Sequence, residues 1–187
     1  MMNMRSKLVV DTDKKRTKKQ WALFITGLIA IIIGTSVIGF YGIRKIYREI
    51  NRQIMFKENV VVEIDALKIK APVLEGTDNK TLAKAVGHFI GTGDTGSGNY
   101  CIAGHSSTIY KEYFNNLKNV ELGMEISLYD KEKKCYTYTV TEHFIVEPNE
   151  TWVLDDFGDD RVTIITCTDD GTQRHVVVGL KELRASE

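Results

Sequence analysis

Residues 161–180, RVTIITCTDDGTQRHVVVGL, contain the pattern that decides the fold. Two apolar runs rich in β-branched residues, 161–166 and 174–180, are separated by a short segment rich in Asp, Thr and Gly. Such runs favour strands, and such a segment favours a turn. We therefore predict a β-hairpin with Cys167 and Arg174 at its loop end.

The residues before this hairpin repeat the same kind of pattern. Apolar residues alternate with polar ones in several short runs, which predicts strands at 60–64, 67–73, 100–105, 125–129 and 135–146. A short helix is predicted at 81–86, with Asp78 or Thr77 as its cap. Many short strands with few helices predict a mostly β domain over residues 59–187, a closed or nearly closed barrel of mostly antiparallel strands.

A long apolar segment precedes this domain. Residues 21–43 contain no charged side chain. A bilayer core about 30 Å thick needs roughly 20 helical residues, so this segment is long enough to be a transmembrane helix. It is longer than the apolar region of a cleaved signal peptide, and no Ala-x-Ala site follows it. We interpret it as a retained anchor, with removal by a peptidase as the alternative.

Charges on either side of the apolar segment bear on its orientation. Residues 1–20 form a basic tail, which predicts a cytoplasmic N-terminus and an extracellular domain in a single-pass protein of the cell membrane. The basic residues that follow the segment weaken this bias: Arg44, Lys45, Arg48 and Arg52. Apolar residues at helical spacing in 44–58 predict a helical stalk. The formal net charge of zero gives no reason to expect nucleic acid as a partner.

The predicted hairpin brings a thiol and a guanidinium together. Residues paired across two strands have Cβ atoms about 4.5–5.5 Å apart, so Cys167 and Arg174 are expected to be neighbours. A cysteine becomes a strong nucleophile once ionised, and Arg can donate hydrogen bonds to a developing oxyanion but cannot act as a base. Asp169 and Asp170 follow the cysteine, and their charge disfavours a thiolate unless they point away.

A proton carrier is then required, and the chain has four histidines. His105 ends an apolar strand, where a barrel would deliver its side chain to a rim. His175 is adjacent to Arg174, so strand alternation turns it to the opposite face. His88 and His143 have no such placement, and we interpret them as ordinary surface or packed residues.

Four motifs, in the same order, resemble those of the sortase family. Residues 163–167, Thr-Ile-Ile-Thr-Cys, followed by Arg174, resemble the signature Thr-Leu-x-Thr-Cys with its Arg. Residues 98–105, Gly-Asn-Tyr-Cys-Ile-Ala-Gly-His, resemble the Asn-x-x-Ile-Ala-Gly-His strand. The other two matching stretches are Phe114-x-x-Leu117 with Gly123, and Val146-x-Pro148 with Val153-Leu154.

The resemblance extends from about Val62 to Leu180, with two departures. Ile164 replaces the usual Leu, and Met124 stands where Asp is common. Residues 87–92 resemble class D or E sortases more than class B, and the chain lacks the amino-terminal lid and second membrane segment of class C. We predict class D.

The resemblance implies a barrel of about eight strands and a thioester mechanism. Cys167 would be the nucleophile, His105 the proton partner and Arg174 the oxyanion donor, with Ala103 and Thr166 among the substrate contacts. The implied substrate is a secreted protein with a carboxy-terminal Leu-Pro-x-Thr-Gly-like sorting signal. The implied acceptor is an amine of a peptidoglycan precursor, so that the protein becomes attached to the cell wall, as in Gram-positive bacteria.

Several alternatives remain open at the level of sequence. The same chemistry could belong to a cysteine hydrolase, or the barrel could be a non-catalytic surface binding module. Trp152 either lines the substrate groove or packs internally. Cys101 and Cys135 are predicted to be buried free thiols, with a disulfide between them as the alternative, and closely spaced zinc ligands are absent. We predict no metal and no cofactor, although the acidic residues between 155 and 160 leave calcium modulation possible.

Overall fold

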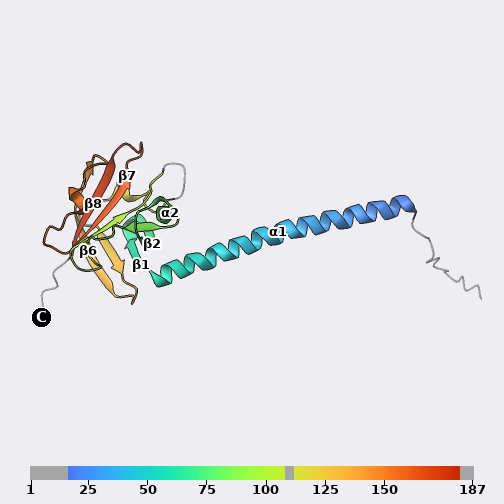
Figure 1. The fold of residues 1–187 in the computed structure, drawn as a ribbon, viewed down its shortest axis with the longest axis horizontal. Coiled ribbons are helices and arrows are strands. Elements are labelled where there is room, and N and C mark those ends of the chain that lie inside the picture. The colour runs from blue at the N-terminus through green and yellow to red at the C-terminus, as the bar shows by residue number, and fades with distance from the viewer. Residues whose placement is uncertain (1–16, 108–111, 182–187) are drawn as a thin grey trace, which may run out of the picture. The chain divides into compact units, whose positions relative to one another are not determined.

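The computed structural model describes residues 17–107 and 112–181. Helix α1 extends without a break from Lys18 to Glu58, so the predicted membrane segment and stalk are parts of one helix (Figure 1). It is long and apolar enough to cross a bilayer. Residues 1–16 of the predicted basic tail lie outside the described residues.

Internal contacts divide the chain into two compact units, residues 1–50 and 51–187. The second unit contains a closed barrel with the strand order β1-β2-β3-β4-β7-β8-β6-β5. Its strands are β1 (Val60–Ile64), β2 (Ile69–Glu75), β3 (Val86–His88), β4 (Asn99–Ala103), β5 (Glu125–Tyr129), β6 (Cys135–Val146), β7 (Arg161–Cys167) and β8 (Arg174–Lys181). Most pairs are antiparallel, and β2–β3 and β4–β7 are parallel. The predicted barrel of mostly antiparallel strands is confirmed.

Short helical segments occupy the connections between the strands. Asp65–Leu67 forms the 3₁₀ helix η1, Asn79–Leu82 the helix α2, Leu117–Asn119 the 3₁₀ helix η2 and Trp152–Leu154 the 3₁₀ helix η3. Asp78 caps α2 by accepting hydrogen bonds from the backbone N–H groups of Lys80 and Thr81. This is one of the two caps that the sequence predicts.

Three predicted boundaries differ from the structure. The helix predicted at 81–86 ends at Leu82, because Val86 begins β3 and pairs with Val73. The strand predicted at 67–73 lies at 69–75, because residues 65–67 form η1. The strand predicted at 100–105 ends at Ala103, so His105 follows the strand instead of belonging to it.

Strand alternation creates two apolar clusters on opposite sides of β7 and β8. The inner cluster fills the barrel and includes Val162, Ile164 and Val177 from these strands. The outer cluster comprises Val146, Val153, Ile165, Val176 and Val178, with Phe89, Phe144 and Leu154 packed against it. Because η3 contributes Val153 and Leu154, the β6–β7 connection covers the outside of the sheet.

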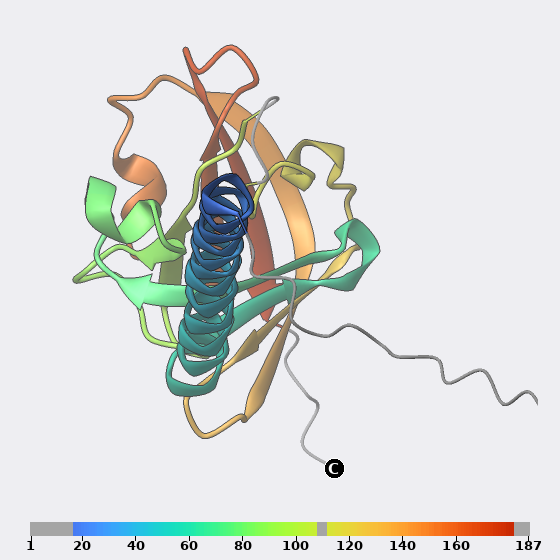
Figure 2. The ribbon, with the colours of Figure 1, turned by 90° about the vertical axis from the view of Figure 1, so that its right-hand side faces the viewer.

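The two ends of the barrel carry different loops. Figure 2 shows the β5–β6 turn (gold) at the lower end and the β7–β8 loop (orange-red) at the upper end. The long strand β6 joins these ends, since Cys135 pairs with Tyr129 and Val146 pairs with Arg174. The end with the β7–β8 loop therefore contains Cys167 and Arg174.

Candidate active site

The three predicted catalytic residues come from three adjacent strands. Strand β7 lies between β4, to which it is parallel, and β8, to which it is antiparallel. Cys167 is the last residue of β7 and pairs directly with Arg174, the first residue of β8. Ala103 ends β4 in register with Ile165, so His105 follows at the same edge of the sheet as Cys167.

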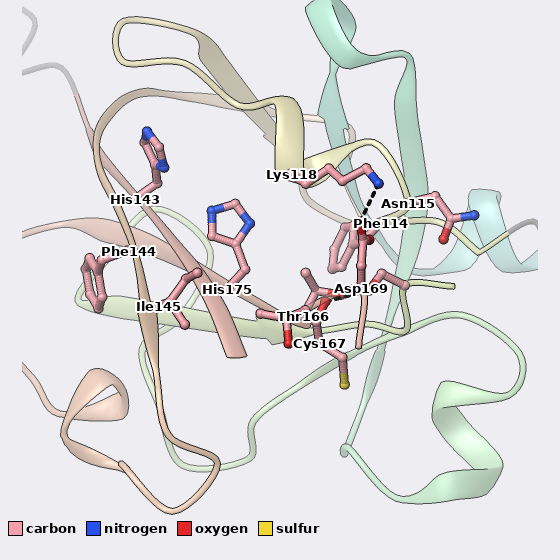
Figure 3. A pocket seen from close by; sticks show the side chains of 12 residues that line it. Phe114, Asn115, Lys118, His143, Phe144, Ile145, Thr166, Cys167, Asp169 and His175 are labelled. Atoms are coloured by element: carbon pink, nitrogen blue, oxygen red, sulfur yellow. Dashed lines mark hydrogen bonds and ion pairs between the residues drawn. The ribbon is translucent and has the colours of Figure 1, made fainter. Parts of the chain in front are cut away.

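Alternation along β7 determines the face on which the thiol lies. Ile164 belongs to the inner cluster and Ile165 to the outer cluster. Cys167 is two residues beyond Ile165 and therefore lies on the outer face. Figure 3 agrees, because the sulfur of Cys167 points away from the imidazole of His175. Arg174 shares the outer face as the partner of Cys167.

Three hydrogen bonds join the end of β7 to the segment around His105. The Gly104 N–H donates to the carbonyl of Ile165 at 3.1 Å, and the Thr166 hydroxyl donates to the carbonyl of Gly104 at 2.8 Å. The Ser106 hydroxyl donates to the carbonyl of Cys167 at 2.6 Å. These bonds flank His105 on both sides, so they hold its backbone beside that of Cys167. Sequence reasoning did not identify Ser106, whose only signal is its position directly after His105.

The backbone at Gly104 approaches other side chains closely. A Cβ atom at this position would lie 2.5 Å from Cδ2 of Phe114 and 2.8 Å from Cγ1 of Val86. Real Cβ atoms essentially never make such short contacts. A glycine is therefore required for the chain to leave β4 at this point and bring His105 to the edge.

The carboxylates that follow Cys167 have other partners. Asp169 forms an ion pair with Lys118 at 2.7 Å (Figure 3). Asp170 accepts hydrogen bonds from the hydroxyls of Thr168 and Thr172, which lower its pKa to about 2. Asp169 therefore faces Lys118, and Asp170 faces its own loop. A thiolate at Cys167 is disfavoured unless these two carboxylates point away from it, and their partners meet this condition.

The side chains of Arg174 and His105 differ in their surroundings. The guanidinium of Arg174 donates from Nη1 to the carbonyls of Gln173 at 3.0 Å and Gly171 at 3.4 Å. It thus lies along the β7–β8 loop and is half-buried. His105 is exposed to solvent. The structure pairs Cys167 with Arg174 and brings the backbone of His105 to the same edge.

The three predicted substrate contacts lie in different places. Ala103 is half-buried beside Ile165, next to the sheet edge that carries Cys167 and Arg174, the proposed catalytic edge. Trp152 is exposed in η3 and stacks on Phe144, with ring centroids 5.6 Å apart. Thr166 is buried, and its side chain lies on the face opposite to that of Cys167. Its hydroxyl donates a hydrogen bond to the carbonyl of Gly104. Ala103 and Trp152 are thus associated with the outer face, whereas Thr166 faces the other side.

The remaining histidines lie elsewhere. His88 is buried, bonds to Glu75 at 3.0 Å and stacks on Tyr100. His143 and His175 face each other edge to face, with ring centroids 5.7 Å apart. His175 pairs with Thr166, so it lies on the face opposite to Arg174, as alternation predicts.

The other two cysteines are both free thiols. Cys101 is buried, and this burial raises its pKa to about 12. Cys135 is exposed at the start of β6, so the prediction that both thiols are buried is wrong for Cys135. The alternation of β6 and its position beside the β5–β6 turn leave this residue at the surface. The disulfide alternative is not realised.

The acidic residues of the β6–β7 connection have partners within the protein. Asp159 pairs with Arg161, and Asp160 pairs with Lys181 at 3.0 Å. Within residues 17–107 and 112–181, no three His, Cys, Asp or Glu side chains are grouped so as to hold a metal ion. The absence of a cofactor stays a prediction.

A family model described as "Sortase domain" matches residues 62–182. Sortase A of Bacillus anthracis is 32% identical over 120 residues, which cover 63% of this chain and 57% of that protein. The chain thus spans little more than half the length of this curated relative.

Solved structures agree with the sequence match. Listeria monocytogenes sortase A superimposes with a TM-score of 0.63 at 29% identity, covering 68% of this chain and 88% of that chain. A Clostridium perfringens sortase D5 transpeptidase gives a TM-score of 0.61 at 27% identity, covering 72% and 89% of the two chains. Relatives of both class A and class D appear, so class D stays a prediction. From its family match, its closed eight-stranded barrel and these relatives, the chain belongs to the sortase family.

Proposed function

We propose that this protein is a cysteine transpeptidase of class D that attaches secreted proteins to the cell wall. The observation that carries the proposal is the meeting of three strand ends: Cys167 and Arg174 are paired, and the backbone of His105 is tied beside them. Family membership supports the same chemistry. The proposed substrate is a protein with a Leu-Pro-x-Thr-Gly-like carboxy-terminal sorting signal.

In the proposed first step, the thiolate of Cys167 attacks the carbonyl carbon of the Thr–Gly-type bond. Arg174 donates hydrogen bonds to the oxyanion of the tetrahedral intermediate. The C–N bond then breaks, and the departing amine takes its proton from His105. The product of this step is a thioester between the substrate and Cys167.

In the second step, an amine of a peptidoglycan precursor attacks the thioester carbonyl. It gives up a proton to His105, and the C–S bond breaks to restore the thiolate. A new amide bond joins the secreted protein to the precursor. Neither step requires a metal or another cofactor, and calcium could act only as a modulator.

The outer face offers a surface for the apolar part of the sorting signal. Ala103 and Ile165 lie side by side, two residues before His105 and Cys167. Ile165 belongs to the outer cluster, against which η3 packs. A Leu-Pro segment would bury apolar surface against these residues, and Trp152 borders the same cluster through its stacking on Phe144.

Helix α1 supports a role at the membrane. We infer that it anchors the protein as a single span, with the N-terminus in the cytoplasm and the barrel outside. In that orientation the barrel meets exported substrates and cell-wall precursors on the same side. Nucleic acid has no part in this function.

A transfer assay on the full chain in detergent micelles tests the proposal. The protein is mixed with a Leu-Pro-x-Thr-Gly peptide library and an excess of triglycine, and products are identified by mass spectrometry. We expect peptides joined to triglycine, no product with Cys167→Ala, and full activity with the control Cys135→Ala. Release of peptide to water alone would indicate a cysteine hydrolase. Absence of both products with the wild type would leave a binding module as the better interpretation, and a Cys167→Ala protein as active as the wild type would exclude Cys167 as the nucleophile.

A further inference from the structure

A cavity reaches Cys167 from the face of β7 and β8 opposite to its sulfur. This cavity has a volume of about 310 Å³ and opens between η2, the end of β6 and the β7–β8 loop. Its lining includes Lys118, His143, Asp169 and His175 as chargeable groups and Phe114 and Ile145 as apolar ones (Figure 3). Ser106, Thr166 and Cys167 also line the cavity, whereas the proposed transpeptidase mechanism uses none of the other side chains named here.

The imidazole of His175 is the most informative group in this cavity. The residue is 9% exposed, and within the described part of the chain no hydrogen bond to its ring is present. No fully buried polar atom of the described residues lacks a partner, so the ring nitrogens of His175 must open onto the cavity. Figure 3 shows the ring projecting from β8 into the space between His143 and Lys118. Ring nitrogens that face a cavity without a protein partner are available to a ligand.

Two more nitrogen groups surround the same space. The imidazole of His143 meets that of His175 edge to face at 5.7 Å. Lys118 pairs with Asp169, but the two side chains are 52% and 57% exposed. Exposed ion pairs contribute little to stability, so Lys118 can exchange Asp169 for another anion. Among the lining residues, three nitrogen groups therefore face one carboxylate.

We propose that this cavity binds an anionic group, a carboxylate or a phosphate, through His175, His143 and Lys118. Both kinds of anion accept charge-assisted hydrogen bonds from imidazolium and ammonium donors. Phe114 and Ile145 provide an apolar wall for the part of the ligand that carries the anion. The proposal does not depend on the transpeptidase activity.

Binding at this site is coupled to protonation. Burial, and then the charge of His143, lower the pKa of His175. An anion favours the protonated ring, so binding takes up a proton and raises this pKa. Affinity is therefore highest at acidic pH and falls as pH rises through the pKa of the bound form. Lys118 and Asp169 are the other charged groups that line the cavity.

The test follows the four histidine ring signals by NMR, with the full chain in non-ionic detergent micelles. Sodium phosphate and N-acetylglycine are titrated separately at constant ionic strength, at pH 6 and at pH 8. We expect saturable shifts of His175 and His143, with an affinity about tenfold higher at pH 6, because each ring gains a charge-assisted hydrogen bond. His88, which is bonded to Glu75, serves as the internal control and is expected not to move.

Variants separate a built site from general attraction to positive charge. Lys118→Gln is expected to weaken binding about tenfold, whereas Lys70→Gln, which removes another exposed ion-paired lysine, is expected to leave it unchanged. Saturable shifts with only phosphate or with only N-acetylglycine support the proposal and identify whether the cavity binds a phosphate or a carboxylate. The proposal is overturned if neither anion gives saturable shifts, or if Lys118→Gln binds as well as the wild type.

Discussion

Ser106 holds the end of β7 through its 2.6 Å hydrogen bond to the carbonyl of Cys167. Removal of this hydroxyl frees the carbonyl and lets the nucleophile move relative to His105. We expect Ser106→Ala to lower kcat of peptide transfer about tenfold, because small displacements of a catalytic group are costly, while KM changes less than about twofold. Steady-state kinetics of the transfer reaction measure both parameters.

Two variants decide whether Ser106 acts by positioning. Ser106→Thr keeps the hydroxyl and is expected to restore kcat. Thr141→Ala removes another hydroxyl-to-carbonyl bond, to Val178, away from the catalytic edge, and is expected to leave kcat unchanged. If Ser106→Ala and Thr141→Ala have the same kcat, the hydrogen bond to Cys167 has no role in catalysis.

Arg174 is expected to contribute to catalysis through the geometry of its guanidinium, which donates hydrogen bonds to the oxyanion. Arg174→Ala should lower kcat about 10²–10³-fold, the usual effect of losing one oxyanion donor. Arg174→Lys keeps the charge but not the planar fork, so we expect only partial recovery. Arg161→Lys, at the opposite end of β7, is the matched control. Wild-type kcat in Arg174→Ala would rule out the proposed role.

For individual residues, the sequence predicts which residues pair within one hairpin better than it predicts contacts between segments that are distant along the chain. Cys167 and Arg174 are separated by a short turn, so their pairing follows from the strand pattern. The bonds from Thr166 and Ser106 join positions about sixty residues apart. They depend on the parallel register of β4 and β7, which no local pattern specifies.

At the scale of elements, Asn99 connects β4, β7 and the β6–β7 connection. Its side chain accepts a hydrogen bond from the Thr163 hydroxyl and donates to the carbonyls of Val153 and Asp155. Asn99 is 2% exposed, and Thr163 and Val153 are also buried, so its removal leaves the Thr163 hydroxyl and the Val153 carbonyl without this partner away from water. We expect Asn99→Ala to lower the free energy of unfolding by about 2 kcal/mol, measured by urea denaturation.

The same substitution is expected to loosen the β6–β7 connection. Limited proteolysis should cleave residues 147–160 faster in Asn99→Ala than in the wild type. Asn116→Ala removes a single bond to the carbonyl of Leu67 and serves as a control with a smaller effect. Equal cleavage rates in all three proteins would show that Asn99 does not hold this connection.

Element types follow from the sequence where the local pattern and the tertiary environment agree. The predicted strands at 60–64, 125–129 and 135–146 match β1, β5 and β6. Val86 shows the opposite case, because its surroundings in sequence are helical but it pairs with Val73 in a parallel ladder. Such ladders form between segments that are distant along the chain, so tertiary pairing overrides the local preference.

At the scale of the whole molecule, closure of the barrel places the sulfur of Cys167 and the imidazole of His175 on two faces of the same strands. Residues of β7 alternate between the outer face, with Cys167, and the inner side, with Thr166. Alternation is visible in the sequence, but the cavity also needs η2 and the end of β6. The sequence therefore predicts the barrel and its catalytic edge, whereas the cavity emerges only from assembly.

The orientation of the membrane anchor can be tested with a thiol that the chain already contains. Cys135 is exposed and free, whereas Cys101 is buried, with a pKa of about 12. In a Cys167→Ala background, a membrane-impermeant maleimide should therefore label Cys135 on intact cells if the barrel is outside. Additional replacement of Cys135 by Ala should abolish the label.

The basic tail is the proposed cause of this orientation, because cytoplasmic flanks of a span are enriched in Lys and Arg. Replacing four of the five lysines before the span by Gln leaves the cations after it in excess, so a fraction of the chains should invert: Lys14, Lys15, Lys18 and Lys19. Labelling of intact cells should then fall, and permeabilisation should restore it. If the wild-type protein is labelled only after permeabilisation, the barrel lies in the cytoplasm and the attachment of exported proteins is excluded.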